Sequence, residues 1–306
     1  MKAHFASGLY PARPEDGFRM DGYYVWCGSC IRGEDGRYYL FASRWPEETG
    51  FPEGYMRASE IVVATAEKPE GPFRYAATVL SAREGGYWDS MMAHNPQIHR
   101  VGDEYLLYYI GTPDGRGETR RIGVARSHSL TDGWVRPDRP IDLPDNANNP
   151  AMTVGPDGMF YLTFRDGELR VSIARSRYPD RDFTVLAYDI FPLGRIEDMY
   201  LFYNEEHRRF EIIAEDGEGK YTGSLGAGAH FCSEDAVHWQ PCEPYMVYDR
   251  TVVYTDGSTV ELQRRERPQL LRDGGELYLF TTAKTGGETR AAGGKTWNMV
   301  QRYRAE

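Results

Sequence analysis

The chain alternates short apolar runs with polar, turn-forming segments, and one arrangement of the two recurs five times. In the second copy, Asn95-Pro96 leads into a short strand, a tight turn at Gly102-Asp103 and the apolar run 105–110. A run this short and this rich in tyrosine favours a buried strand over a helix. The equivalent positions of the five copies, called anchor residues below, are Cys27, Asn95, Asn149, Asp198 and Arg267.

The intervals between successive anchor residues are 68, 54, 49 and 69 residues, or roughly 60 on average. A repeat of this length, built from short strands in each unit, is typical of a propeller. A helical solenoid would require long apolar stripes at helical spacing, and the sequence has none of useful length. We therefore expect an all-β fold, a five-bladed β-propeller of four-stranded antiparallel blades.

We expect residues 1–306 to form a single propeller domain, because five repeats fill the whole chain. Residues 1–21 include Pro11, Pro14 and Gly17 and are predicted to form an extended entry arm. The arm either adds the outer strand of the last blade or leaves the ring to close by packing. The approximate blade ranges are 22–80, 88–143, 147–192, 198–250 and 261–304.

Composition narrows the possible partners. The net charge is -10 and the sequence pI about 5.3, so neither nucleic acid nor an anionic membrane is expected as a partner. The 22 tyrosines and 6 tryptophans suit strand packing, and they also suit a surface on which sugar rings stack. No pattern in the sequence indicates an oligomeric state.

Targeting and metal signals are weak. The segment 1–6 lacks an apolar core, so no secretory signal is expected and we predict a cytoplasmic protein. No apolar run reaches 18 residues, so no membrane span is expected. Cys27 and Cys30 have the spacing of a zinc ribbon, but no second pair completes it, and we predict no metal ligands.

In a propeller the innermost strands begin around a central channel, so residues just before them converge on one point. The converging groups include many carboxylates and amides, and hydrolysis of a glycosidic bond requires two carboxyl groups, one acid and one base. The predicted catalytic residues are Asp89, Asp198 and Glu266. The predicted substrate-binding residues are Arg44, Trp45, Glu60, Trp88, His94, Asn95, Asn149, Arg165, Glu197 and Arg267.

Each candidate also has a purely structural interpretation. Asp198 and Glu197 would then only accept hydrogen bonds at the channel mouth, and Glu266 would be a buried partner of a neighbouring arginine. Asp89 would cap a turn. The tryptophans would belong to the core rather than to a sugar platform.

The chain resembles the five-bladed propeller glycoside hydrolases of the clan that contains families 43 and 117. The resemblance is strongest to an uncharacterised group similar to family 43 and covers nearly the whole chain. The segments that carry it are Ser43–Pro46, Ser59–Ile61, Trp88-Asp89 with His94–Pro96, Glu197-Asp198 and Glu266–Gln269.

Three anchor residues depart from family 43. Cys27 stands where the family has its general base, Asn95 where an aspartate tunes the acid, and Asn149 where the acid is usually a glutamate. Only Asp198 keeps the aspartate, so the family's catalytic triad does not transfer by position. Similarity to family 117 allows a histidine, here His94, as the acid.

The resemblance implies an exo-acting hydrolase that removes a terminal sugar from a plant or microbial oligosaccharide with inversion. Asp89 or Asp198 would activate water, and Glu266 or His94 would protonate the leaving oxygen. Inversion requires carboxyl groups about 6.5–9.5 Å apart, and retention about 5–5.5 Å.

Two other functions stay open. The missing anchor acids favour a non-catalytic carbohydrate-binding propeller. A glycoside phosphorylase would need a cationic cluster for phosphate, which Arg44, Arg165 and Arg267 would supply. No cofactor is required, and the resemblance allows a structural calcium ion in the channel.

Overall fold

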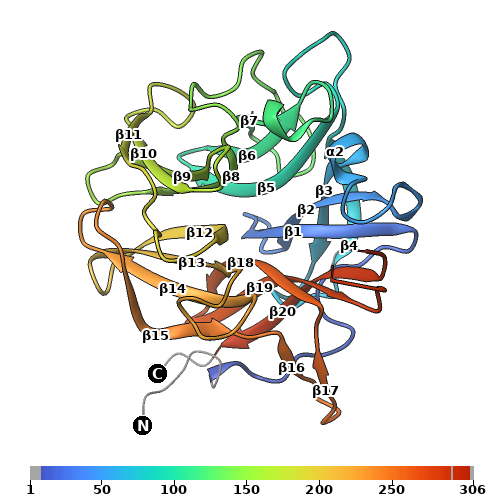
Figure 1. Ribbon diagram of the computed structural model, residues 1–306. Helices are drawn as coiled ribbons and strands as arrows, with labels where there is room; N and C mark the ends of the chain where they lie inside the picture. The colour runs from blue at the N-terminus through green and yellow to red at the C-terminus, as the bar shows by residue number, and fades with distance from the viewer. Residues whose placement is uncertain (1–7, 291, 304–306) are drawn as a thin grey trace.

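The computed structural model describes residues 8–290 and 292–303. Its sheets are arranged around one axis, as Figure 1 shows, and the prediction of a five-bladed, all-β propeller is confirmed. The inner strands β1, β5, β8, β12 and β18 each contact the next around the axis, and β18 contacts β1. The blades therefore form a closed circle.

The strands follow one another outward in each blade. Blade one contains β1 (Tyr23–Arg32), β2 (Tyr38–Pro46), β3 (Glu60–Ala66) and β4 (Arg74–Leu80), and blade two contains β5 (Met92–Val101), β6 (Glu104–Thr112) and β7 (Arg121–Ser127). Blade three contains β8 (Asn148–Val154), β9 (Phe160–Arg165), β10 (Val171–Ser176) and β11 (Thr184–Ala187). Blade four contains β12 (Ile196–Asn204), β13 (Arg209–Asp216), β14 (Ala227–Ser233) and β15 (Gln240–Tyr248). Blade five contains β18 (Arg264–Asp273), β19 (Glu276–Thr285) and β20 (Lys295–Tyr303).

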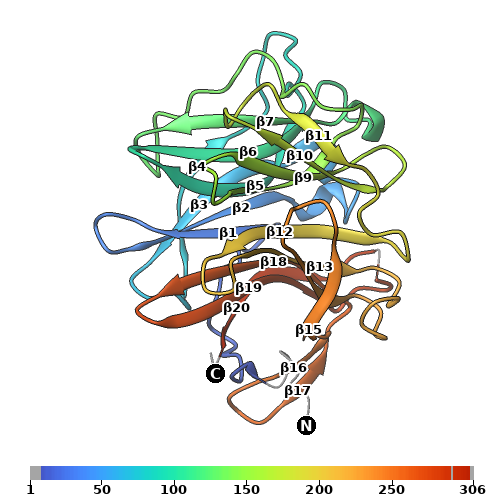
Figure 2. The ribbon, with the colours of Figure 1, turned by 90° about the vertical axis from the view of Figure 1, so that its left-hand side faces the viewer.

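Short elements join the blades. The hairpin β16 (Thr251–Val253) and β17 (Thr259–Glu261) connects blades four and five and lies at the periphery (Figure 1, Figure 2). The 3-10 helices η1 (Glu47–Thr49) and η2 (Gly117–Thr119) and the helix α2 (Tyr55–Ala58) lie in loops. Among the described residues, no helix has the length and apolar character needed to cross a membrane.

Isolated β-bridges, one in blade two and two in blade five, take the place of a fourth strand in these blades. In blade two, Val135 pairs with Arg126. In blade five, the entry arm pairs with β20, because Phe18 exchanges two backbone hydrogen bonds of 2.9 Å with Asn298. A Cβ atom on Gly17 would lie 1.9 Å from the Asn298 carbonyl oxygen, so only glycine allows this approach. The described part of the arm, from residue 8, therefore lies beside β20 at the outer edge of blade five.

The middle strands are buried on both faces because neighbouring blades pack against them. In β6 every residue from Tyr105 to Thr112 is buried, as the aromatic run in the sequence predicts. Similar apolar clusters join each blade to the next; one brings Leu40 and Val62 of blade one against Phe280 and Val300 of blade five. Burial between blades, rather than one central core, holds the ring together.

Each inner strand is interrupted at its anchor residue. All five anchors adopt the left-handed conformation, with φ between 51° and 57°, and each falls where the strand changes register against its neighbour. This conformation is uncommon for a residue with a side chain, and a bulge of this kind re-aims side chains. Pro96, Pro150 and Pro268 directly follow anchors, where the interrupted ladder does not need their missing N–H group.

Candidate functional site

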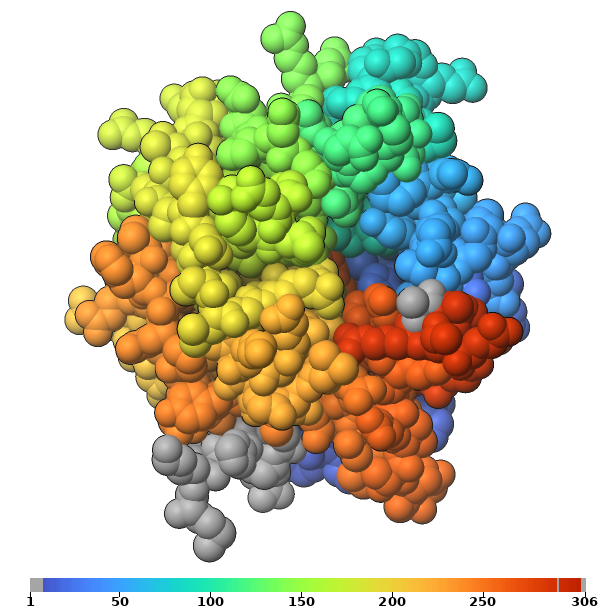
Figure 3. All heavy atoms as spheres, in the orientation of Figure 1, coloured from blue at the N-terminus to red at the C-terminus, as the bar shows by residue number. Residues whose placement is uncertain are grey.

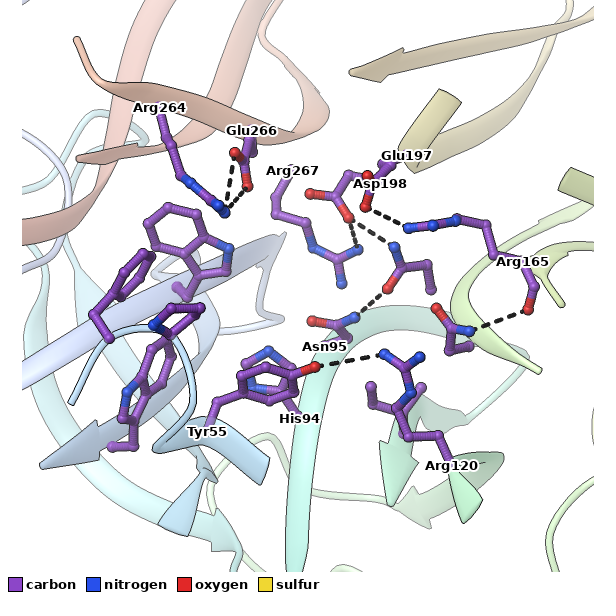
Figure 4. A pocket seen from close by; sticks show the side chains of 17 residues that line it. Tyr55, His94, Asn95, Arg120, Arg165, Glu197, Asp198, Arg264, Glu266 and Arg267 are labelled. Carbon is purple, nitrogen blue, oxygen red and sulfur yellow. Dashed lines mark hydrogen bonds and ion pairs between the residues drawn. The ribbon is translucent and has the colours of Figure 1, made fainter. Parts of the chain in front are cut away.

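A pocket of about 140 Å³ occupies one end of the central channel. Figure 3 shows a recess near the centre of the molecule, where segments from different blades meet. The residues that line the pocket are Trp26, Trp45, Phe51, Pro52, Tyr55, His94, Asn95, Ile110, Arg120, Asn148, Asn149, Arg165, Glu197, Asp198, Arg264, Glu266 and Arg267 (Figure 4). They come from all five blades, so no single segment of the sequence contains the site.

The five anchor side chains form a hydrogen-bonded ring across the channel. The Cys27 thiol donates to Asn95 Oδ1 at 2.8 Å, and Asn95 Nδ2 donates to Asn149 Oδ1 at 2.6 Å. Asn149 Nδ2 and Arg267 Nη1 both donate to Asp198 Oδ1 at 2.9 Å. Arg267 also interacts with the Cys27 sulfur, which completes the circle.

This anchor ring is the floor of the pocket. A second cavity, of about 30 Å³, lies on its other side and is lined by Cys27, Asp198 and Arg267 among others. Burial raises the pKa of Cys27 to about 12, against the charge of Arg267, so the thiol stays protonated and acts as a donor. The ring therefore blocks passage along the channel.

The residues directly before the anchors form much of the pocket wall. Matching the five repeats to one another identified the correct bulges. The side chains that face the pocket most directly, however, lie one position before the anchors. These wall residues are Trp26, His94, Asn148, Glu197 and Glu266. The anchor side chains themselves chiefly form hydrogen bonds with one another.

Three buried carboxyl groups lie close together beside the floor. One oxygen each of Asp198, Glu215 and Glu266 lies within 4.8 Å of the others. Burial raises the pKa of Glu266 to about 7, against the opposing charge of Arg264 and with further repulsion from Asp198. Burial also raises the pKa of Asp198, opposed mainly by Arg267. Burial and then repulsion from Glu266 raise the pKa of Glu215 well above its usual range.

Such a cluster cannot ionise completely, since like charges at this distance disfavour each other. Glu266 is therefore an acid that can hold a proton near neutral pH while it faces the pocket. Glu266 is 5% exposed, so the surrounding protein, rather than bulk water, sets its pKa. A raised carboxyl pKa in a concave site is characteristic of a general acid.

Glu215 was missed by the sequence prediction. It is the penultimate residue of β13 and pairs across the ladder with Glu197, as Arg165 at the end of β9 pairs with Asn148. The sequence signal was available, because Arg165 was selected for its place at the end of a second strand. The same reasoning applied to blade four selects Glu215.

Arg120 and Tyr55 were also missed. Both lie in loops or short helices between the second and third strands, at lengths that differ from blade to blade. No repeat positions these loops relative to the channel. Only the folded structure brings them to the pocket.

Aromatic rings form one side of the pocket, and His94 packs among them. The His94 ring stacks on Tyr55 at 4.6 Å between ring centroids, and its Nδ1 lies 2.8 Å from Ser59 Oγ. Burial, with the charges of Arg267 and Arg120, lowers the pKa of His94 well below its usual range. His94 is therefore neutral at physiological pH, which argues against its predicted alternative role as the acid.

Trp45 lines the pocket with only 1% of its surface exposed. Its ring stacks on Phe51 at 5.9 Å, and its indole N–H donates to the Gly50 carbonyl oxygen at 3.2 Å. Trp45 is therefore mainly a support for the aromatic wall. Asn95 and Asn149, both predicted to bind substrate, lie in the floor.

Three arginines of the wall and floor pair with the carboxylates there. Arg267 contacts Asp198 at 2.9 Å, Arg264 contacts Glu266 at 3.4 Å, and Arg165 contacts Glu197. Arg195 adds a second contact to Glu197 at 2.9 Å, and Arg290 contacts Glu215 at 2.5 Å. Of the predicted residues, the structure thus brings together Asp198, Glu266, Trp45, His94, Asn95, Asn149, Arg165, Glu197 and Arg267.

Asp89 does not reach the pocket, contrary to the predicted catalytic role. It is fully buried within blade two, where Arg83 contacts it at 2.8 Å and Arg136 at 3.2 Å. The Tyr109 hydroxyl donates to the same carboxylate at 2.8 Å. Trp88 packs on Tyr109 at 5.2 Å between ring centroids. Both residues serve the packing of blade two.

Arg44 and Glu60 also lie outside the pocket. They pair with each other at 2.6 Å on β2 and β3. The Arg44 guanidinium lies between the rings of Tyr23 and Tyr75, at 4.5 and 4.7 Å from their centroids. The ends of second and third strands therefore do not all reach the pocket: Arg165 at the end of β9 does, whereas Arg44 and Glu60 turn to each other and to the tyrosine rings.

A calcium ion, which the resemblance allows but the sequence does not require, has a candidate ligand set but a poor fit. In the described part of the chain, Asp198, Glu215 and Glu266 are the one group of three possible metal ligands that lie close enough together. Each already contacts a guanidinium group, from Arg267, Arg290 and Arg264 respectively. These cations neutralise the carboxylates as a calcium ion would, so no step is assigned to a metal.

Comparison with known proteins shows the fold without showing a family. No protein-family model matches the chain, and no curated protein matches its sequence. Solved structures match over nearly its whole length. CoXyl43, a family 43 β-xylosidase/α-arabinofuranosidase from a compost microbial metagenome in complex with xylotriose, superposes with a TM-score of 0.67 at 13% identity, covering 100% of this chain and 96% of its own. This chain has the fold of a glycoside hydrolase propeller.

Two further structures share this propeller fold. Zg3597, a family 117 glycoside hydrolase produced by Zobellia galactanivorans, gives a TM-score of 0.66 at 15% identity over 96% of this chain and 88% of that one. BT0996, solved as an RGII complex, gives 0.70 at 14% identity over 96% and 93%. The propeller architecture that the resemblance implied is therefore confirmed, and the function rests on the site itself.

Proposed function

We propose that the protein is a glycoside hydrolase that removes one terminal sugar by direct displacement with water. The observation that carries this proposal is Glu266, a pocket-facing carboxyl group whose pKa burial raises to about 7. A protein that merely binds sugar has no need of an acid tuned to neutral pH. The shared fold with family 43 and family 117 enzymes adds support.

Glu266 is the proposed general acid, which protonates the leaving oxygen. Glu197 is the proposed base, because it contacts Arg165 and Arg195, and its side chain is 23% exposed and so within reach of water. This assignment differs from the sequence-based prediction, which gave the base role to Asp89 or Asp198 and placed Glu197 among the substrate-binding residues. Asp198 has an oxygen within 4.8 Å of Glu266, which is short for the separation of about 6.5–9.5 Å that inversion requires.

The closed floor supports action at a chain end. A cavity of about 140 Å³ is smaller than the roughly 300–1,000 Å³ typical of drug-sized ligand sites, so it suits one sugar ring. The anchor ring prevents a polysaccharide from threading through the channel. The rest of an oligosaccharide would then extend outward from the mouth, past the aromatic wall.

A panel of aryl glycosides in both anomeric forms tests the proposal. Glu197→Gln should lower kcat/KM by roughly 10²- to 10⁴-fold for every substrate that the wild type cleaves. Glu60→Gln is the matched control, since Glu60 lies outside the pocket, and should change kcat/KM by less than about twofold. Absence of turnover across the whole panel would favour the non-catalytic sugar-binding propeller.

The stereochemistry of the first product tests the choice of base. NMR of the newly released sugar should show the anomer opposite to that of the substrate. Retention of configuration would instead assign Asp198 as a nucleophile, because its short distance from Glu266 is closer to the retaining separation of about 5–5.5 Å.

A further inference from the structure

Four arginines line the pocket, but only three carboxylates do. The four are Arg120, Arg165, Arg264 and Arg267, and the carboxylates are Glu197, Asp198 and Glu266. Three of the arginines each contact one carboxylate, as described above. Arg120 remains as the fourth, and within residues 8–290 and 292–303 no carboxylate lies within 4.0 Å of its guanidinium nitrogens.

Neutral oxygens hold Arg120 in place. Its Nε donates to the Gly117 carbonyl oxygen at 2.8 Å and to Asn146 Oδ1 at 3.2 Å, and its Nη1 lies 3.5 Å from the Tyr55 hydroxyl. Figure 4 shows its guanidinium directed into the pocket, across from Arg264 and Glu266. The side chain is therefore fixed, with its charge unmatched, in a chain whose net charge is -10.

The neighbouring Arg165 also has unused capacity. It is 5% exposed, and its buried Nε has no hydrogen-bond partner although the group contacts Glu197. Asn148 Nδ2 donates to the carbonyl oxygens of Asn146 and Arg165, so one short segment supports both arginines. One side of the pocket thus carries excess positive charge and spare donors.

We propose that the pocket binds a sugar bearing a carboxylate, a uronic acid residue, and that Arg120 binds this carboxylate. The proposal rests on the proposed glycosidase function and names its substrate class. A guanidinium group matches a carboxylate in shape and charge, and it forms paired, charge-assisted hydrogen bonds with it. A neutral sugar would leave the charge of Arg120 partly desolvated and unpaired, which is costly.

A carboxylate fits better than free phosphate. Three of the four arginines already contact protein carboxyl groups, so Arg120 is the one guanidinium group of the pocket left for a ligand anion among the described residues. A phosphate group carries roughly -1.5 to -2 at neutral pH and usually requires several cations. Inorganic phosphate nevertheless shares the anionic chemistry, and the experiment separates the two.

Calorimetric titration at pH 7 tests the proposal with glucuronate and galacturonate against glucose and galactose. At least one uronate should bind the wild type about tenfold or more tightly than its neutral counterpart. Arg120→Gln should remove this preference, weakening uronate binding roughly 10- to 100-fold and leaving neutral sugars nearly unchanged. Inorganic phosphate should neither bind with comparable affinity nor stimulate turnover.

Arg121→Gln is the matched control, since it removes one positive charge from the next residue, which contacts the exposed Asp145 at 2.8 Å. It should leave uronate binding within about twofold of the wild type. The proposal is overturned if neither uronate binds, if neutral sugars bind equally well, or if Arg120→Gln leaves uronate binding intact. Phosphate binding through Arg120 without uronate binding would also overturn it, in favour of a phosphorylase.

Failure of the glycosidase proposal can be told apart from failure of the uronate assignment, because uronate binding is measured without turnover. Arg120-dependent uronate binding without hydrolysis of any aryl uronide would contradict the hydrolase and leave the ligand assignment standing. Hydrolysis of neutral aryl glycosides, with no binding or cleavage of uronides, would support the hydrolase and overturn the uronate assignment.

Discussion

A single buried carboxylate in blade two and a cluster of three in blades four and five show how similar residues serve different purposes in this propeller. In blade two, Asp89 is fully buried, and Arg83, Arg136 and Tyr109 all contact it. In blades four and five, Asp198, Glu215 and Glu266 are also buried, but they lie within 4.8 Å of one another. Asp89 faces only donors, whereas Glu266 faces two other acids in addition to Arg264.

The difference separates a structural acid from a chemical one. Two arginines and a tyrosine hydroxyl contact the Asp89 carboxylate inside blade two, so Asp89 works as a structural partner. A carboxyl group that competes with neighbouring acids can hold a proton near neutral pH, and Glu266 also faces a cavity. Burial alone therefore does not identify a catalytic acid; the charges around it do.

The largest expected effect is the loss of catalysis in Glu266→Gln. Glutamine cannot protonate a leaving group, so kcat/KM should fall roughly 10²- to 10⁴-fold for substrates with poor leaving groups. Aryl glycosides with acidic phenols need less protonation and should lose much less. Steady-state kinetics over a series of phenols measures this dependence. An equal loss across the series would contradict the role of general acid.

Asp89→Asn should lower stability and leave catalysis nearly unchanged. Without the negative charge, the largely buried Arg83 and Arg136 lose their buried carboxylate partner, so the free energy of unfolding should fall by about 3–5 kcal/mol. Urea denaturation measures it. The folded fraction should keep its kcat within about twofold, since Asp89 lies outside the pocket. A selective loss of kcat at unchanged stability would return Asp89 to the site.

In the acid cluster, the contribution of Glu266 to stability should depend on pH. Glu266 has a pKa of about 7 in the folded protein against 4.5 as its ordinary value, so the folded state holds the proton more tightly. Its stabilising effect is complete below pH 4.5 and is lost as the pH rises through about 7. Relative to Glu266→Gln, the wild type should lose on the order of 3 kcal/mol of unfolding free energy over this range.

Denaturant titrations of both proteins at several pH values check this trend. Glu60→Gln serves as a control, since Glu60 lies outside the acid cluster and pairs with Arg44. A constant difference between wild type and Glu266→Gln from about pH 4.5 to 8 would show that the folded protein does not hold a proton on Glu266.

The smallest effect is expected in the anchor ring. Asn149→Ala removes one donor to Asp198 and the acceptor for Asn95, and it should lower the free energy of unfolding by roughly 1–3 kcal/mol. Asn149→Gly is the matched control, because glycine tolerates the φ of 51° at this position. The difference between the two variants measures the backbone strain. Thermal or urea unfolding with no loss in either variant would mean that the ring adds nothing to stability.

Much of the fold was predictable from sequence. The spacing of Cys27, Asn95, Asn149, Asp198 and Arg267 identified five units, and the structure places all five in equivalent bulges of the inner strands. Local chemistry explains this success. Aromatic and β-branched runs specify strands, Gly-Asp and Asp-Gly pairs specify turns, and Asn-Pro marks an interrupted ladder, so each signal lies within a few residues.

The site was predictable only in part. Glu266, Asp198 and Glu197 were found because they lie next to the repeat, where the inner strand begins. Asp89 resembled them in sequence, but whether its side chain faces Arg83 or the channel depends on packing between strands. Arg120 and Tyr55 come from loops with no fixed place in the repeat.

What the sequence determined by itself is the periodic framework, because strand and turn preferences act over short distances. What only the tertiary structure decided is which charged groups meet. Glu215, Glu266 and Asp198 repel one another, and Arg120 lacks a carboxylate partner among the described residues, because the ring of blades brings distant segments to one axis. Electrostatic energies depend on these separations in space, and spacing along the chain does not encode them.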